Sequence, residues 1–312
     1  MAVAPLAHAV AAAYRAAMPA ALTVAPRLLA MAALLAACSP ARTSPPPSAS
    51  AATATTATTP IVIGESFTMP ARAIGGEPRR INVWLPPRGA GDTARLPVLY
   101  MPDGGMQEDF LHIAGLLQVS IGNGTMRPFM LVGIENTQRR RDLTGPTRNA
   151  RDSTVAPRVG GSAAFRAFIR DELIPEVNRR YPTTAERAIV GESLAGLFVV
   201  ETLLLEPALF DTYVAFDPSV WWDDARLVHE SAARLRAMGT MSTTRKTLWV
   251  ATSGEREITV LGRRLVDSIA TARPAGLVSH YEPMPGEQHS TIFHPAATRA
   301  FRAVFAPDTT KR

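Results

Sequence analysis

Short apolar runs rich in β-branched and aromatic residues alternate with longer stretches of helical periodicity along most of this 312-residue chain. Strands separated by helices form parallel βαβ units, so the alternation predicts an α/β protein with a mostly parallel central sheet and helices on both faces. Strands are expected at Arg80–Leu85, Val98–Met101, Phe129–Glu135, Arg187–Val190, Thr212–Phe216, Thr247–Thr252 and Val278–Glu282.

The composition supports a globular core and excludes several classes of protein. Hydrophobic residues make up 46% of the chain and charged residues 19%, which is typical of a folded domain. The net charge of +6 comes from 33 basic and 27 acidic residues whose signs are interspersed, so no basic face points to nucleic acid. A single cysteine excludes a disulfide framework and a multi-thiolate metal site.

The first 37 residues have the organisation of an export signal. They contain Arg15 and Arg27, no acidic residue, and an apolar run over residues 28–37 that is too short to span a bilayer. The run ends in Leu-Ala-Ala-Cys38, which resembles the lipobox of bacterial lipoproteins, in which the cysteine is acylated. We therefore expect an exported protein anchored by lipid at Cys38 to a bacterial membrane, facing the periplasm or the exterior. The alternatives are an ordinary signal peptide with a chance cysteine and a true start at Met18.

A low-complexity segment follows the cysteine. From residue 39 to residue 60 every residue except Arg42 is Ser, Pro, Ala or Thr, a composition that cannot build a core. Residues 38–60 are therefore expected to be a tether, residues 61–306 one folded domain and residues 307–312 a tail.

The strongest local motif is the hexapeptide Gly191-Glu-Ser193-Leu-Ala195-Gly196. It lies between the strand expected at Arg187–Val190 and an apolar helix over Leu197–Leu205. This approximates the G-x-S-x-G nucleophile elbow, in which small residues permit a strained turn that exposes the serine hydroxyl. The fifth position is Ala195 instead of Gly, so the motif depends on its context of strand and helix.

A serine hydroxyl needs a base to take its proton, and imidazole has the appropriate pKa. His289 lies in a turn after the last expected strand and before the terminal helix, where a loop can carry it to Ser193. His294 is the reserve candidate. His229 and His280 fall inside a helical stretch and a strand, where packed or surface histidines are more usual.

The base needs a carboxylate that orients it and stabilises its cation. Asp217 follows one intermediate strand, and Glu255 and Glu257 follow the next. Position alone leaves all three open.

Together these segments resemble the "putative esterase" family of α/β-hydrolases, which includes esterase D-like enzymes, bacterial mycolyltransferases and enterochelin-type siderophore esterases. The resemblance to the siderophore esterases is the strongest, and it implies an α/β-hydrolase fold. Two departures from the family pattern are Glu192, where a His is usual, and Ala195, where a Gly is usual. The similar segments are Leu99–Gly105, Val132–Asn136, Arg141–Thr144, Glu172–Tyr181, Gly191–Phe198, Asp217–Trp222 and Glu287–Ser290.

The resemblance also implies roles for particular residues. The family acid usually lies three residues after a glycine at a strand end, which favours Glu257, with Glu255 second and Asp217 third. The oxyanion hole is expected from the backbone N–H of Leu194 and that of Gly105 or Met106.

Substrate contacts are expected from aromatic and basic residues near this site. Trp221 and Trp222 are candidates for an aromatic wall, with Met106 opposite, although packing under a loop is an equal alternative. An arginine-rich segment over residues 139–158, including Arg141, is either a solvated loop or a rim that attracts anions.

These inferences predict a serine esterase that cleaves carboxylic esters through an acyl-enzyme and needs no metal or organic cofactor. Its partners would be a small-molecule ester and, through the anchor, a membrane, but no nucleic acid. Siderophore-type esters follow from the resemblance. The alternatives are an acyltransferase of the mycolyltransferase type and a catalytically quiet binding lipoprotein. The oligomeric state stays open.

Overall fold

The computed structural model describes residues 58–89, 91–154, 156–237 and 245–307. The predicted signal peptide, Cys38 and the tether up to residue 57 lie outside the described residues.

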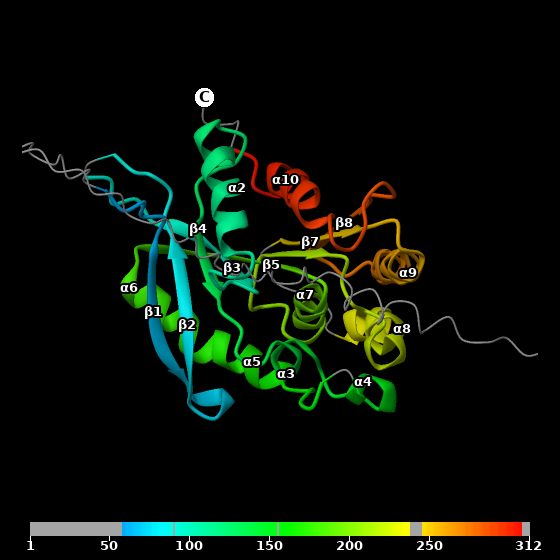
Figure 1. Cartoon of the computed structure of the whole chain (residues 1–312). Coiled ribbons are helices and arrows are strands. Elements are labelled where there is room, and N and C mark those ends of the chain that lie inside the picture. The colour runs from blue at the N-terminus through cyan, green and yellow to red at the C-terminus, as the bar shows by residue number, and fades with distance from the viewer. Residues whose placement is uncertain (1–57, 90, 155, 238–244, 308–312) are drawn as a thin grey trace, which may run out of the picture. The chain divides into compact units, whose positions relative to one another are not determined.

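Eight strands in the described part of the chain form one sheet in the order β1-β2-β4-β3-β5-β6-β7-β8 (Figure 1). The pairs β1–β2 and β2–β4 are antiparallel, and the remaining pairs are parallel. The seven predicted strands are all present, so the mostly parallel sheet is confirmed. The bounds are β1 Glu65–Ala71, β2 Glu77–Trp84, β3 Leu96–Pro102, β4 Met130–Ile134, β5 Thr183–Glu192, β6 Thr212–Phe216, β7 Lys246–Thr252 and β8 Leu277–Pro283.

Strand β1 was not predicted from the sequence. It lies at the edge of the sheet and most of its residues are exposed, so it lacks the buried apolar run by which the other strands were recognised.

Helices cover both faces of the sheet (Figure 1). One face carries α2 and α10, and the other carries α3 and α5–α9. A π-helical turn over Ile169–Leu173 joins α5 to α6, which has Pro175 in its first turn. The bounds are α2 Phe110–Gly122, α3 Arg139–Leu143, α4 Ala150–Thr154, α5 Ser162–Phe168, α6 Ile174–Arg180, α7 Leu194–Leu205, α8 Trp222–Ala237, α9 Arg256–Ala272 and α10 Phe293–Val304.

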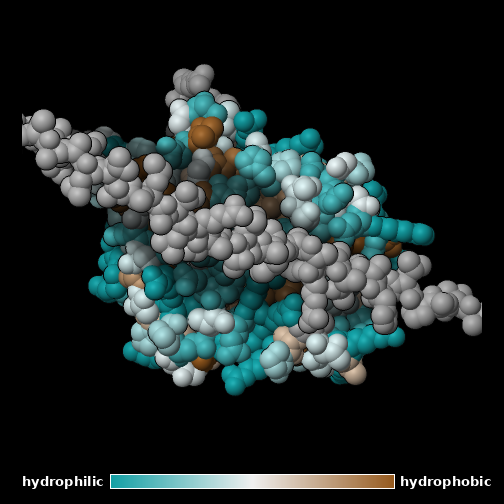
Figure 2. All heavy atoms as spheres, viewed as in Figure 1, coloured by the Kyte–Doolittle hydropathy of each residue, from teal (hydrophilic) through white to brown (hydrophobic). Residues whose placement is uncertain are grey.

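Two apolar clusters, one on each face of the sheet, form the core. Strands β3, β4 and β6 are buried along their whole length, as expected for the centre of a sheet covered on both faces. Figure 2 shows a mostly hydrophilic surface with apolar side chains gathered over α2, where Val119 is 63% exposed. Within the described ranges, no helix is both long enough and apolar enough to cross a membrane.

The carboxyl ends of the parallel strands bring the candidate residues to one edge of the sheet. Asp103 follows β3, Ser193 follows β5 and Asp217 follows β6. All three have positive φ angles, of 57°, 61° and 40°, which non-glycine residues rarely adopt. Strained backbone at three neighbouring strand ends marks this edge as the candidate site.

Candidate active site

Ser193 occupies the sharp turn between β5 and α7, as the elbow motif predicted. Its backbone N–H donates to the carbonyl of Phe216, 3.0 Å away, which ties the turn to the end of β6. A Cβ atom at Gly191 would lie 2.7 Å from the Cβ of Ala195, so the glycine is required by close approach. Ala195 is therefore tolerated because Gly191 leaves it room.

His289 reaches Ser193 from the loop between β8 and α10. Its Nε2 lies 3.0 Å from the Oγ of Ser193, within hydrogen-bond reach. The loop is held in place from β7: the His289 backbone N–H donates to the Glu255 carboxylate at 3.0 Å, and the Gly254 N–H donates to the Glu287 carbonyl at 2.9 Å. The structure thus brings together the two residues that the sequence singled out.

The carboxylate beside the imidazole belongs to Asp217. One of its oxygens lies 3.1 Å from Nδ1 of His289, and the other accepts the N–H of Ser253 at 2.5 Å. The residue is fully buried. Because the His289 ring bridges Ser193 and Asp217, the three side chains form the arrangement of a nucleophile, a base and an orienting acid.

The prediction that Glu257 orients the imidazole is wrong. Glu257 lies in the first turn of α9, is exposed, and is not the carboxylate at Nδ1 of His289. The second candidate, Glu255, contacts the backbone of His289 and not its ring. The spacing of three residues after Gly254 failed to identify the acid because it places Glu257 in the first turn of α9, where it is exposed, whereas Asp217 is buried at the end of β6.

The electrostatics of His289 follow from these neighbours. The hydrogen bond with Asp217 raises the pKa of the imidazole above its ordinary value of 6.5, although burial opposes the shift. The carboxylates of Glu192 and Glu255 raise the pKa further. The protonated imidazole is therefore stabilised, as a base that must take a proton from serine requires.

One predicted oxyanion donor is occupied. Leu194 begins α7, so its N–H belongs to the group of helix-start donors that have no partner within the helix. The N–H of Gly105, by contrast, donates to the Glu108 carboxylate at 2.7 Å, while the Glu108 N–H donates back to the Gly105 carbonyl. The two bonds close a turn over residues 105–108, and they leave the Gly105 N–H paired with the Glu108 side chain. Met106 stays the alternative.

A cluster of charged groups borders the serine. It includes Glu192, which stands where the family pattern has a His, and also Asp103, Asp109 and Arg139, which were not predicted as site residues. Asp103 accepts two hydrogen bonds from the guanidinium of Arg139, both at 2.7 Å. Burial raises the pKa of Glu192 to about 7 and that of Asp109 to about 6. Among the residues that the structure places, no group of three His, Cys, Asp or Glu side chains is arranged to hold a metal ion.

Two of the predicted substrate contacts have structural partners instead. Trp222 is 4% exposed and its indole N–H donates to the Gly145 carbonyl at 2.9 Å. Arg141 donates to both oxygens of Glu77 and to Asp142, which lies in the core. Trp222 therefore packs in the interior, and Arg141 forms ion pairs within the protein. Of the two tryptophans, Trp221 is half-buried and is the one that can contact a substrate.

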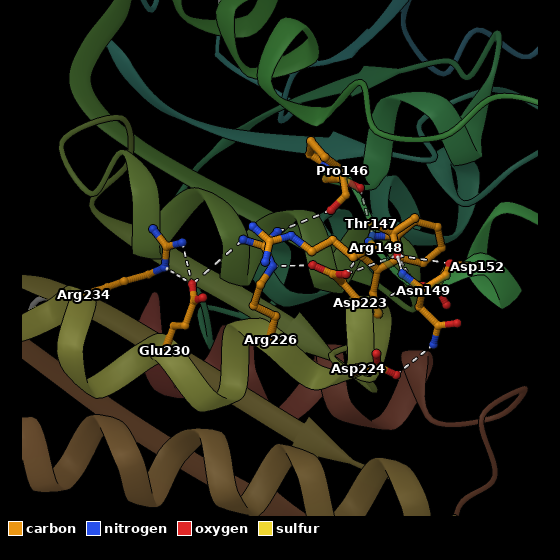
Figure 3. A network of polar contacts seen from close by, with 12 residues as sticks. Pro146, Thr147, Arg148, Asn149, Asp152, Asp223, Asp224, Arg226, Glu230 and Arg234 are labelled. Carbon is orange, nitrogen blue, oxygen red and sulfur yellow. Dashed lines mark hydrogen bonds and ion pairs between the residues drawn. The ribbon is translucent and has the colours of Figure 1, made fainter.

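A polar network fixes the loop that follows Asp217 (Figure 3). Residues 223–225 all have positive φ angles, between 52° and 57°. The turn is held because the Asp223 N–H donates to Asp152 at 2.8 Å, while the Asp223 carboxylate accepts the Arg148 N–H at 2.6 Å and pairs with Arg226. The network joins the start of α8 to α4 and to the loop before it.

Two cavities lie at other predicted residues. Met106 and Phe110 line one of about 360 Å³, together with residues 61–66, Arg80 and Asn82. A second cavity, of about 410 Å³, is lined by residues 138–141 and 156–158 and includes four arginines. Arg139 belongs to this second cavity and to the cluster around Glu192, so the arginine-rich segment borders the site.

Three other histidines of the described residues, His112, His280 and His294, have partners of their own. The Nδ1 of His294 lies 2.8 Å from the Nε2 of His112 on α2, and His280 stacks on Trp249 within β8 and β7. The choice of His289 over the reserve candidate His294 therefore agrees with the geometry.

The family model described as "Putative esterase" matches residues 72–300. This range contains strands β2 to β8 and excludes β1. The chain belongs to this esterase family. The fold and the family resemblance expected from the sequence are thereby confirmed. Membership of the family makes this protein an ester hydrolase.

Named relatives agree with this assignment. The chain is 27% identical to the ferri-bacillibactin esterase BesA of Bacillus subtilis over 279 residues, which cover 78% of this chain and 92% of the Bacillus protein. It is 33% identical to the siderophore triacetylfusarinine C esterase of Aspergillus fumigatus over 178 residues, 51% of this chain and 57% of the fungal protein.

A solved structure of a serine hydrolase has a similar fold. The IroE-like serine hydrolase from Shewanella oneidensis superposes with a TM-score of 0.69 and 27% identity, covering 78% of this chain and 80% of that one. The similarity supports the α/β-hydrolase fold.

Proposed function

We propose that this esterase is a serine hydrolase that cleaves carboxylic esters through an acyl-enzyme, with Ser193 as nucleophile, His289 as base and Asp217 as the orienting acid. The observation that carries the proposal is the chain of contacts from Ser193 Oγ to Nε2, at 3.0 Å, and from Nδ1 to Asp217, at 3.1 Å. No single element supplies these groups: they come from the ends of β5, β6 and β8.

The geometry supports the following sequence of steps. Nε2 of His289 takes the proton of Ser193 as Oγ attacks the ester carbonyl, and Asp217 stabilises the imidazolium through Nδ1. The N–H of Leu194, with that of Met106 as the second donor, stabilises the developing oxyanion. The imidazolium then protonates the leaving alkoxide, and water repeats the sequence on the acyl-enzyme and releases the acid.

The first experiment is covalent labelling with a fluorophosphonate probe, combined with a panel of aryl esters. Labelling and turnover should disappear in Ser193→Ala and fall sharply in His289→Ala, because the members of a triad act as one unit. Glu257→Gln, an exposed carboxylate, is the matched control and should label normally. Full ester turnover by Ser193→Ala would contradict the mechanism.

We propose esters of the siderophore type as substrates. Two relatives are named for the siderophore esters that they cleave, and the cavity lined by Arg139, Arg140 and Arg158 offers a basic surface beside the site. Ferric trilactone siderophores should therefore be cleaved faster than neutral aryl esters. Product analysis with added alcohols separates hydrolysis from acyl transfer: acylated alcohol as the main product would favour the transferase.

The basic cavity can be tested by itself. Replacing Arg140 and Arg158 by Gln should raise KM about threefold to tenfold for an anionic ester at low ionic strength, and the effect should shrink with added salt. A neutral ester and the exposed Arg302→Gln on α10 are the controls. Equal effects on KM for both esters would indicate that the arginine-rich segment is an ordinary solvated loop.

We also propose that the chain is an exported lipoprotein anchored at Cys38. The proposal is supported by the apolar run that ends directly before the only cysteine. Labelled palmitate should enter the protein in a bacterial host, and Cys38→Ala should abolish the labelling. Persistent labelling of that variant would contradict the anchor.

A further inference from the structure

Glu192 places a second carboxylate against the imidazole of His289. It is the last residue of β5 and directly precedes Ser193. Its Oε1 lies 3.7 Å from Nε2 of His289, and its side chain is 18% exposed. Nε2 therefore has two oxygen neighbours, the Oγ of Ser193 at 3.0 Å and the Glu192 carboxyl, while Nδ1 has Asp217.

The groups that face Glu192 come from three directions. Arg139 of α3 favours its charged form, and Asp103 and Asp109, after β3, disfavour that form. His289, in the loop after β8, is the third and favours the charged form when the imidazole is protonated. Asp217, Glu192 and Glu255 in turn surround His289. Arg139 is itself held by Asp103 in a bidentate pair, so it does not neutralise Glu192 directly.

Both partners have pKa values above their ordinary ones. Burial raises the pKa of Glu192 to about 7, and the hydrogen bond with Asp217 raises the pKa of His289. Two ionisable groups whose atoms lie 3.7 Å apart cannot titrate independently, because the charge on one changes the pKa of the other.

We propose that Glu192 and His289 share one proton as a coupled pair, and that Glu192 is a positioning residue that sets the protonation state of the base. The inference rests on the proposed function, since it concerns the same imidazole.

The shared proton can reside either on the Glu192 carboxyl or on Nε2 of His289. When it lies on Glu192, the imidazole is neutral and Nε2 can accept the Ser193 proton. When it lies on Nε2, the imidazolium faces an ionised Glu192 and cannot act as a base. Loss of the shared proton leaves a neutral imidazole beside a carboxylate, which then stabilises the imidazolium that forms as Ser193 attacks. Activity should therefore rise with pH in two overlapping steps.

The test is the pH profile of kcat/KM in the full chain with a neutral aryl ester. The wild type should show a broad acid limb that spans two ionisations. Glu192→Gln removes the negative charge, so the limb should narrow to one ionisation with its midpoint lower by about one pH unit. Glu192→Asp keeps a carboxylate and should keep the broad limb. Glu257→Gln, on the exposed start of α9, should match the wild type.

A readout that needs no turnover separates this inference from the proposed function. In Ser193→Ala protein with labelled histidine, the imidazole resonance absent from a His289→Gln sample should titrate in two steps, and adding Glu192→Gln should reduce them to one at lower pH. Identical titrations with and without Glu192 overturn the coupling even if Ser193 is the nucleophile. Two-step titration in a protein whose Ser193→Ala form still cleaves esters keeps the coupled pair and overturns the mechanism instead.

Discussion

The ends of β6 and β7 lie side by side at the same edge of the sheet, and both are followed by carboxylates. Asp217, after β6, has a φ angle of 40° and is fully buried. Its own N–H donates to the Ala251 carbonyl of β7, and its carboxylate accepts the Ser253 N–H just beyond β7. Glu255 and Glu257, after β7, lie at the N-terminal end of α9 and are exposed. The acid after β6 is thus buried and accepts a backbone N–H, whereas the acids after β7 are exposed.

The difference shows that a carboxylate after a strand is not enough to make an orienting acid. A buried carboxylate needs donors that compensate for its lost hydration. Asp217 has both the Ser253 backbone N–H and the imidazole, whereas Glu255 has the His289 backbone N–H and not the ring. Glu257 has a local explanation, because acidic residues in the first turn of a helix are stabilised by the helix dipole.

The largest expected effect is on kcat, when each of the two acids is replaced separately by its amide. Asp217→Asn should lower kcat about 10⁴-fold with little change in KM, because the amide favours the wrong tautomer and leaves the imidazolium without its partner. Glu257→Gln should stay within about twofold of the wild type, as surface substitutions usually do. Steady-state kinetics on one ester measure both. Loss of activity in the Glu257 variant with full activity in the Asp217 variant would reverse the comparison.

A smaller effect is expected on stability from the rest of the β6 loop. Asp223→Ala should lower the free energy of unfolding by about 2 kcal/mol, because the Arg148 N–H and the Arg226 guanidinium lose a buried charged acceptor. Denaturant unfolding measures the change. Asp224→Ala, which loses a single exposed bond to Asn149, is the matched control and should cost much less.

The same residue makes the stability depend on pH. Burial opposes ionisation of Asp223, but the hydrogen bonds from Arg148 and Arg226 outweigh it and hold its pKa below the ordinary 3.8. A lowered pKa in the folded state means that the stabilisation is present above about pH 4 and is lost as the pH falls through the folded-state value. The stability difference between the wild type and Asp223→Ala should therefore narrow in acid. A difference that stays constant down to pH 2 would contradict this.

The smallest effect should come from Glu255, which supports the His289 loop through a single bond. Glu255→Ala removes the acceptor of the His289 backbone N–H and should lower kcat/KM about tenfold, through misplacement of the ring. Glu255→Gln keeps an acceptor oxygen and should recover most of the activity. Because the Glu255 charge raises the pKa of His289, the Gln variant should also shift the acid limb of the profile slightly to lower pH. A loss in the Ala variant as large as that of Asp217→Asn would make Glu255 the orienting acid.

Most of the fold could be predicted because its signal is local. Consecutive residues encode the buried apolar runs of β3 and β6. They also encode the strand, the turn and the helix around Ser193. Edge strand β1 was not predicted because most of its residues are exposed and it has no buried apolar run. In the site, the serine and the histidine were accessible from motif and position, whereas the acid required knowing which of two neighbouring strand ends turns inward.

The sequence by itself determined the parallel sheet, the nucleophile elbow and the position of His289 in the loop before α10, because each depends on residue types at short spacing. Only the tertiary structure decided that Asp217 faces His289, that Glu108 occupies the Gly105 N–H, and that Trp222 packs inward. It also placed Glu192 at 3.7 Å from the imidazole. Hydrogen bonds and burial between segments tens of residues apart fix these choices, and such pairings leave no periodic trace in a single chain.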